Sequence, residues 1–256
     1  MPHFKRYIAL GDSMSIDLYP ALDLRETDVA VALERDPSAG HVAPIGAASL
    51  LHRNSEAHWP DDTGDDLSSH HSGIQFDIFA SDGATIGDVF GEQVPRLEPS
   101  DDPVLVTLTI GGNDLLSAYG NRPRRGVLEK IERDIAEAYD VLVDTLRALF
   151  PNLTLVVTTI YDPSDRTGRI PGVYDDYGPL PLDILDRLND HIRALALGTP
   201  HVLLADVYLR FLGHGVSVPD ADRWYWQRSL IEPNARGASE IRHAWLEALK
   251  REAVID

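Results

Sequence analysis

The fold is decided by the stretch YIALGDSMS at residues 7–15. Its four leading apolar residues run directly into Gly11-Asp12-Ser13, a pattern typical of a buried parallel strand that ends in a small-residue turn. Open α/β sheets bind their ligands at the edge where such strands end. Ser13 is therefore a candidate nucleophile, and the alternative is that Ser13 only caps the helix that follows.

Further apolar runs along the chain predict four more strands, each followed by a segment with turn signals. These strands are expected at residues 74–80, 104–110, 153–160 and 202–205. Apolar positions at helical spacing predict helices at 86–97, 127–149, 182–197 and 234–248, with shorter ones at 16–24 and 43–51. Strands that alternate with helices predict an α/β fold with a parallel sheet and helices on both of its faces.

The domain organisation follows from what lies between these elements. No linker or internal repeat divides the chain, so we expect a single domain over residues 1–256. Residues 25–73 are irregular, and we interpret them as a long insertion, a lid over the carboxyl edge of the sheet. Residues 161–181 and 211–229 are expected to be loops.

Composition excludes several classes of partner and site. The net charge of −18 argues against a nucleic-acid partner and against binding to an anionic membrane surface. With no cysteine, the chain has no disulfide and no thiolate metal site. The apolar run before Gly11 is too short for a signal peptide, and no run approaches the roughly 18 residues of a membrane span, so the cytoplasm is the expected compartment.

An acidic and histidine-rich stretch at residues 61–71 is a candidate for binding a hard cation. Its residues keep no ligand spacing, so a solvated polar loop is the favoured interpretation. We therefore expect no metal and no cofactor.

Three predicted strands end in small polar turns, which parallel strands bring to the same edge of the sheet. The turns are Gly11-Asp12-Ser13, Asp82-Gly83 and Gly111-Gly112-Asn113-Asp114. An oxyanion hole needs donors aimed at one point, and the N–H groups of Ser13 and Gly83 with the side-chain amide of Asn113 provide three. Taken singly, the glycine suits a tight turn and the asparagine a helix cap. Taken together, the three turns favour a catalytic site.

These turns resemble the sequence blocks of the SGNH, or GDSL-type, serine hydrolase family, and the resemblance covers nearly the whole chain. It implies that Ser13 is the nucleophile and that Gly83 and Asn113 are oxyanion residues. We add Asp12, Gly112 and Asp114 as candidate substrate-binding residues. The family fold is flavodoxin-like, a three-layer α/β/α arrangement with a five-stranded parallel sheet, and the family hydrolyses esters of many kinds.

The last block departs from the family pattern, in which an aspartate and a histidine supply the catalytic acid and base. Here the histidine position holds Glu232 and the aspartate position holds Ser229. Glu232 is one candidate base, provided that burial raises its pKa toward neutrality. Trp224 and Trp226 are candidates for the apolar surroundings, and Ser229 is a candidate hydrogen-bond partner.

A histidine from elsewhere in the chain is the other candidate base. His214 lies in a glycine-flanked loop after the fifth strand, at the right edge of the sheet. His243, deep in the last helix, and His70 and His71 in the insertion are more remote candidates. A single histidine is more often structural than catalytic.

The sequence thus favours a serine hydrolase of carboxylic esters with a non-standard base. Its partner is then a small-molecule ester. The alternative is an inactive protein of the same fold, in which Ser13, Gly83 and Asn113 bind a carbonyl- or carboxylate-bearing small molecule or a sugar. The acyl group, the alcohol and the oligomeric state are not encoded in any motif.

Overall fold

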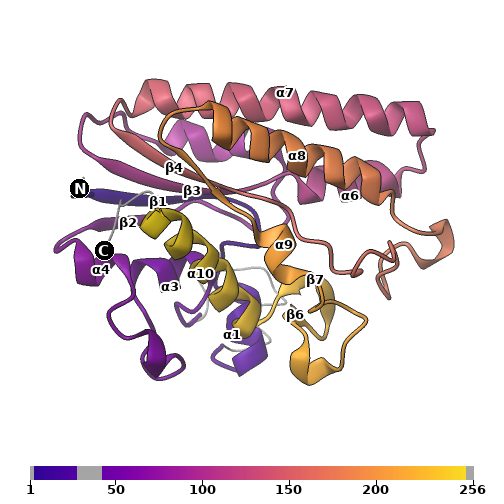
Figure 1. Cartoon of the computed structure of the whole chain (residues 1–256), viewed down its shortest axis with the longest axis horizontal. Helices are drawn as coiled ribbons and strands as arrows, with labels where there is room; N and C mark the ends of the chain where they lie inside the picture. Colours follow the sequence, from indigo (N-terminus) through magenta and orange to yellow (C-terminus); the bar gives the residue numbers. More distant parts are fainter. Residues whose placement is uncertain (1–2, 28–41, 252–256) are drawn as a thin grey trace.

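Five parallel strands form the central sheet, in the order β2-β1-β3-β4-β5. The computed structural model describes residues 3–27 and 42–251, so residues 28–41 of the expected insertion lie outside the described residues. The strands are β1 (Arg6–Gly11), β2 (Gln75–Ile78), β3 (Val104–Thr109), β4 (Leu153–Thr158) and β5 (Val202–Ala205). All five occur where the sequence predicts them, and the α/β fold is confirmed (Figure 1).

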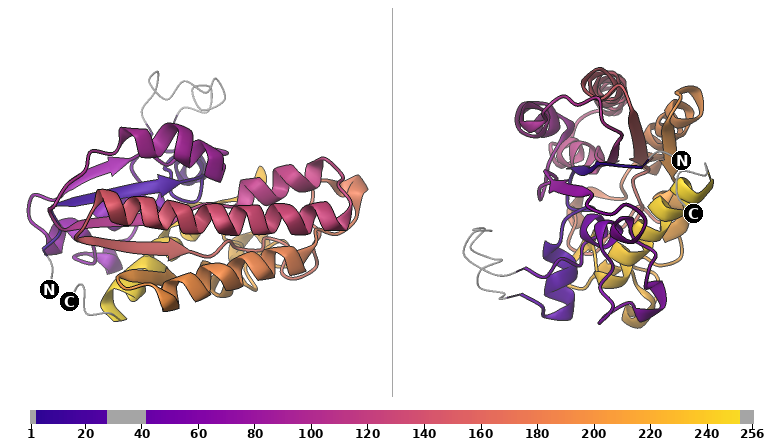
Figure 2. Two further views of the ribbon diagram at one scale, coloured as in Figure 1. Left: turned by 90° about the horizontal axis from the view of Figure 1, so that it is seen from above. Right: turned by 90° about the vertical axis from the view of Figure 1, so that its left-hand side faces the viewer.

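Helices cover both faces of the sheet, as Figures 1 and 2 show from three directions. One face carries α5 (Ile86–Asp88), α6 (Gly112–Gly120), α7 (Arg125–Leu149) and α8 (Leu182–Gly198). The other carries α3 (Ala47–His52), α4 (Leu67–His70), α9 (Val207–Phe211) and α10 (Ala235–Arg251), with α1 (Leu18–Leu24) beside α10. Short helical turns are η1 (Pro60–Asp62), η2 (Val89–Gln93), η3 (Val94–Arg96), η4 (Asp175–Tyr177) and η5 (Asp220–Asp222).

The two cores are built by alternation along each strand. In β1, Ile8 and Leu10 join the core beneath α7 and α8, whereas Tyr7 and Ala9 join the core beneath α3 and α10. All four side chains are fully buried. Burying a large aliphatic or aromatic side chain stabilises a fold by about 1.5–3 kcal/mol, so this strand is anchored on both faces and its end is fixed in space.

Three predictions of local structure were wrong, and each failed at a short or irregular element. Residues 86–97 are α5, a π-helical turn and a 3₁₀ turn, because Pro95 cannot donate a helical hydrogen bond. The turn after β3 continues into α6, which was not predicted. The stretch expected to be a loop at 211–229 contains most of a hairpin of β6 (Tyr225–Trp226) and β7 (Ser229–Pro233), which pair antiparallel.

The described part of the insertion packs against the side of the molecule. Helix α3 contacts α10, and α4 contacts α3. No residue of 42–73 lines the pocket beside Ser13 that is described below. Among residues 3–27 and 42–251, no helix is long and apolar enough to cross a lipid bilayer.

Candidate active site

The turn that carries Ser13 begins at a position that only glycine can occupy. Gly11 has φ of +119°, and a Cβ there would lie 1.8 Å from the carbonyl oxygen of Thr109. The buried Gln93 side chain holds this residue from the other side: its amide accepts from the N–H of Gly11 and donates to its carbonyl, both at 2.8 Å. The end of β1 is therefore locked between β3 and η2, and Ser13 is delivered to the carboxyl edge of the sheet.

Hydrogen bonds link all three small polar turns to one another. The N–H of Asp12 donates to Thr109 at 2.8 Å, and the N–H of Ser81 donates to Gly11 at 3.0 Å. The Asn113 amide donates to the carbonyl of Ala84 at 3.0 Å. The structure thus brings the three predicted blocks together at one edge.

Three donors remain at this edge for a bound oxyanion. In the described part of the chain, the N–H groups of Ser13 and Gly83 donate to no protein acceptor. Asn113 uses one amide hydrogen on Ala84 and keeps a second. Ser13, Gly112 and Asn113 line a common pocket, whereas Gly83 lies in an exposed turn outside its lining.

Glu232 reaches Ser13 from β7. The Glu232 carboxyl group is 7% exposed and interacts with the Ser13 hydroxyl, which favours its ionised form. Among the described residues, Ser229 included, its second oxygen, Oε2, has no hydrogen-bond partner although it is buried. Burial raises the pKa of Glu232 to about 8, although the Ser13 hydroxyl by itself lowers this pKa. This value is higher than the near-neutral one that the sequence predicts.

The hairpin that carries Glu232 is fixed at both ends. The Tyr161 hydroxyl donates to the carbonyl of Ile231 at 2.7 Å. The Asn234 side chain donates to the carbonyl of Arg223 and accepts from the N–H of Gly237, each at 2.8 Å, so it joins the hairpin to the start of α10. A carboxyl group on such a support keeps its position relative to Ser13.

The pocket beside Ser13 is mostly apolar. Its walls come from α6, from the loop at residues 160–181 and from α8, with Asp12, Ser13 and Glu232 at the polar side. Trp224 and Trp226, the expected apolar surroundings of Glu232, do not line this pocket. Asp12 is buried too, and burial raises its pKa to about 7 although the N–H of Met14 donates a hydrogen bond to its carboxyl group and the Thr109 hydroxyl also lowers the pKa.

The remaining predicted site residues are placed as follows. His214 stacks on Trp224, with ring centroids 3.7 Å apart, and its Nδ1 lies 3.1 Å from the carbonyl oxygen of Asp222. It does not line the pocket. Asp114 accepts from the N–H of Ile86 at 3.1 and 3.2 Å, so it fixes the second block and also lies outside the pocket lining.

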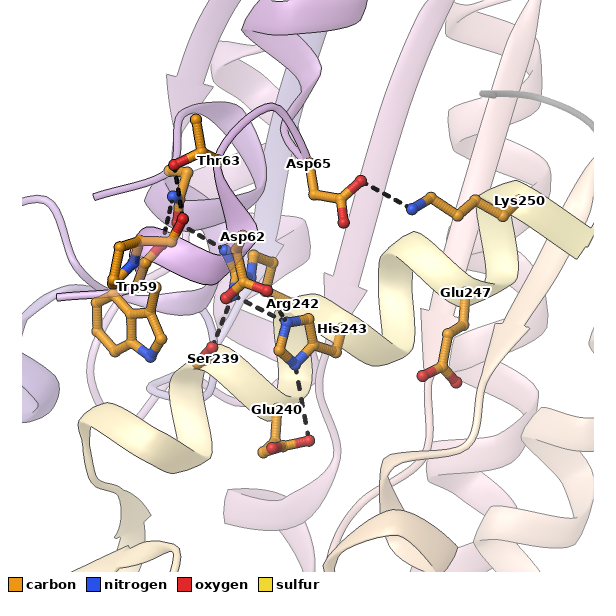
Figure 3. Close-up of polar contacts among 12 residues, drawn as sticks. Trp59, Asp62, Thr63, Asp65, Ser239, Glu240, Arg242, His243, Glu247 and Lys250 are labelled. Carbon is orange, nitrogen blue, oxygen red and sulfur yellow. Dashed lines mark hydrogen bonds and ion pairs between the residues drawn. The ribbon is translucent and has the colours of Figure 1, made fainter. Parts of the chain in front are cut away.

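The other histidines belong to different parts of the molecule. His71 packs against Phe4, and burial lowers its pKa to about 4. His243 lies between Asp62 and Glu240 on the far side of α10 (Figure 3). In the acidic stretch, Asp62 pairs with Arg242 and Asp66 caps α4, and no group of three or more potential metal ligands occurs among the described residues.

Gln93 and Tyr161 support the site and were not predicted. Gln93 had a signal in the sequence, because it is a polar residue four positions after Val89, on the apolar face of the expected helix. Tyr161 follows a predicted strand directly, but nothing in the sequence links its hydroxyl to Ile231.

Comparisons with known proteins agree with this geometry. The model of the GDSL-like Lipase/Acylhydrolase family matches residues 38–239. No curated protein matches the chain. Among solved structures, a phospholipase A1 from Streptomyces albidoflavus has a TM-score of 0.60 at 20% identity, covering 97% of this chain and 99% of that one. An acetylxylan esterase from Geobacillus stearothermophilus has a TM-score of 0.60 at 13% identity, covering 97% and 96%.

Proposed function

Because the chain belongs to the GDSL-like lipase/acylhydrolase family, we propose that it hydrolyses carboxylic esters through Ser13, with Glu232 as the base. The observation that carries the proposal is that the buried Glu232 carboxyl group lines the same pocket as Ser13 and interacts with its hydroxyl. A base must come within hydrogen-bond reach of the proton that it removes, and among the candidate bases Glu232 is the one that lines the pocket with Ser13. His214, the alternative, is engaged with Trp224 and Asp222.

The chemistry has two halves. Ionised Glu232 takes the proton of Ser13 as the oxygen attacks the ester carbonyl, and the N–H groups of Ser13 and Gly83 with Asn113 receive the oxyanion. Protonated Glu232 then gives its proton to the departing alcohol. In the second half a water molecule attacks the acyl-enzyme, with Glu232 again taking the proton and Ser13 as the leaving group.

The raised pKa of Glu232 makes it a stronger base than an exposed carboxylate, at the cost of a small ionised fraction. With a pKa of about 8, most Glu232 is protonated at neutral pH. Only the ionised form accepts a proton, so kcat/KM rises with pH and levels off above about 8. This enzyme is expected to work best in mildly alkaline solution.

The test is a pH–rate profile for p-nitrophenyl butyrate with four proteins. Wild type should show the rise through about pH 8, and Ser13→Ala should fall to the buffer rate. Glu232→Gln should lose about 10²–10⁴-fold in kcat/KM, together with the rise. His214→Gln is the matched control and should keep the wild-type profile. Loss of the rise in His214→Gln and its retention in Glu232→Gln would assign the base to the histidine.

One observation favours a second function, a binding protein for a carbonyl-bearing small molecule. A Glu232 carboxyl group that is protonated at neutral pH is a hydrogen-bond donor, and its Oε2 has no hydrogen-bond partner in the part of the chain that the structure describes. Equal rates for wild type and Ser13→Ala across several acyl lengths, with retained ligand binding, would establish this alternative.

A further inference from the structure

The pocket beside Ser13 contains no group that would hold a charged ligand. Among the described residues that line it, none is a lysine, arginine or histidine. Of its carboxyl groups, Asp162 already accepts from Ser164 and from the N–H of Arg166. Burial raises the pKa of Asp12 to about 7 and that of Glu232 to about 8, so neither carries a full negative charge near neutral pH. An anionic acyl group would find no cation here, and desolvating it would be costly.

The apolar walls extend well beyond the reacting group. They include Leu116 of α6, Leu128 of α7 and Ile184 of α8. Helix α7 contacts both α6 and α8, and the three helices lie on the same side of the sheet (Figure 1). The pocket that Ser13 lines thus takes wall residues from all three helices. An acetyl group would leave most of this apolar surface without contacts.

A cluster of tyrosines fixes the outer wall of the pocket, which is the loop at 160–181. The Tyr119 hydroxyl contacts the carbonyl oxygens of Tyr177 and Pro179, each at 3.2 Å. Tyr174 stacks on Tyr177, and Arg122 lies over the Tyr177 ring at 3.8 Å from its centroid. The N–H of Leu180 donates to Gly168 at 2.7 Å. The loop at 160–181 is thus fixed against α6 as a wall, and the space behind it is preformed.

From these observations we propose that the pocket binds the acyl chain of the substrate, and that this chain is neutral, apolar and longer than acetyl. The proposal rests on the proposed ester hydrolysis at Ser13. The acyl side is favoured over the alcohol side because the alcohol must receive its proton from Glu232, at the polar side of the pocket, whereas α6, α7 and α8 form the opposite walls. The fold does not decide this point, since its solved examples include both a phospholipase A1 and an acetylxylan esterase.

The experiment compares kcat/KM for p-nitrophenyl acetate, butyrate, hexanoate and octanoate, with the monosuccinate ester as the anionic probe. Each buried methylene is worth about 0.8 kcal/mol, which is about fourfold in kcat/KM. Wild type should therefore prefer hexanoate to acetate by at least about 50-fold and should reject the succinate ester. Leu116→Trp narrows the pocket and should lower the ratio of hexanoate to acetate kcat/KM about tenfold or more. Leu197→Trp is the matched control on the exposed face of α8 (87% exposed) and should behave as wild type.

The outcomes separate the two proposals. Serine-dependent hydrolysis that is fastest with acetate, and that Leu116→Trp leaves unchanged, would overturn the acyl pocket and leave ester hydrolysis intact. If no ester is hydrolysed, calorimetric titration of Ser13→Ala protein with p-nitrophenyl hexanoate decides the matter. Binding that weakens at least tenfold in the Ser13→Ala, Leu116→Trp double variant supports the pocket, and no binding overturns it.

Discussion

The burial of Glu232 supports the proposed chemistry but lowers the stability of the folded protein at high pH. Its pKa in the folded protein is about 8, well above the ordinary value of 4.5. Between these values the folded chain binds a proton that the unfolded chain has released, so the free energy of unfolding falls as pH rises through this range. At pH 5, protonated Glu232 leaves the free energy of unfolding intact. This free energy therefore falls progressively as pH rises, and the loss is complete only above about pH 8.

This sign leads to a prediction for Glu232→Gln, which cannot ionise and has nearly the same shape. At about pH 5 the variant should be about as stable as wild type. At about pH 9.5 it should be more stable, by an amount on the order of 3 kcal/mol, even though its activity is lost. Urea unfolding at the two pH values measures the difference.

Asp12 and Asp17 also have pKa values raised by burial, and they remain in both proteins. Their contribution cancels in the comparison between variant and wild type. A Glu232→Gln variant that is no more stable than wild type at high pH would show that the carboxyl group ionises freely in the folded protein. The proposed base would then be an ordinary exposed carboxylate.

At the scale of elements, α10 carries a second set of titrating side chains on the face away from the site. His243 lies 3.0 Å from Asp62 through Nε2 and 3.8 Å from Glu240 through Nδ1 (Figure 3). The ion pair with Glu240, together with the hydrogen bond to Asp62, raises the pKa of His243 although burial and Arg242 act in the opposite direction. Protonated His243 thus joins α10 to η1.

The pH dependence of this contact has the same sign as that of Glu232 but begins at a higher pH. A raised histidine pKa contributes stability that is fully present below about pH 6.5 and is lost as pH rises through the folded-state value. His243→Gln should therefore lower the free energy of unfolding by about 1 kcal/mol more at about pH 5.5 than at about pH 8.5. The measurement at high pH gives the stability that is lost with the packing of the histidine alone. An equal loss in the free energy of unfolding at both pH values would contradict the raised pKa of His243.

The elements themselves were predictable where burial decides them. The runs at β1 and β3 are apolar on both faces, because each strand packs against two layers of helices, and such runs are visible without knowledge of the partners. The hairpin of β6 and β7 was not predictable, because tertiary contacts hold its residues. Trp226 packs against Tyr19 of α1, and Tyr225 packs against Phe211. Helix α6 was hidden because Gly112-Asn113-Asp114 also fits a turn.

At the scale of the whole molecule, the site depends on contacts between residues far apart in the sequence. Ser13, Gly83 and Asn113 are recognisable because each follows a strand directly, and the sheet topology brings them to one edge. The partners of Glu232 are not recognisable in this way. The pocket that Glu232 lines is built from α6, the loop at 160–181 and α8, and pairing at such sequence separation leaves no local pattern.

The segment at residues 42–73 packs on α10 and lies apart from the site. Arg242 is fully buried and forms an ion pair with Asp62 of η1, with further bonds to Asn54 and Ser239 (Figure 3). Removing one member of a buried pair leaves a charge without its partner, which is strongly destabilising. Asp62→Asn should therefore lower the free energy of unfolding by about 2 kcal/mol, and less than the full cost of an isolated charge because Asn54 and Ser239 remain.

Asp65→Asn is the matched control, because Asp65, in the loop after η1, pairs with Lys250 of α10 at an exposed position. Its effect on the free energy of unfolding should stay below about 0.5 kcal/mol. Since no described residue of 42–73 lines the pocket, both variants should keep kcat/KM for p-nitrophenyl hexanoate within about twofold of wild type well below their melting temperatures. A rise in KM for Asp62→Asn at unchanged stability would instead place this segment over the site, as a lid whose closure the Asp62–Arg242 pair controls.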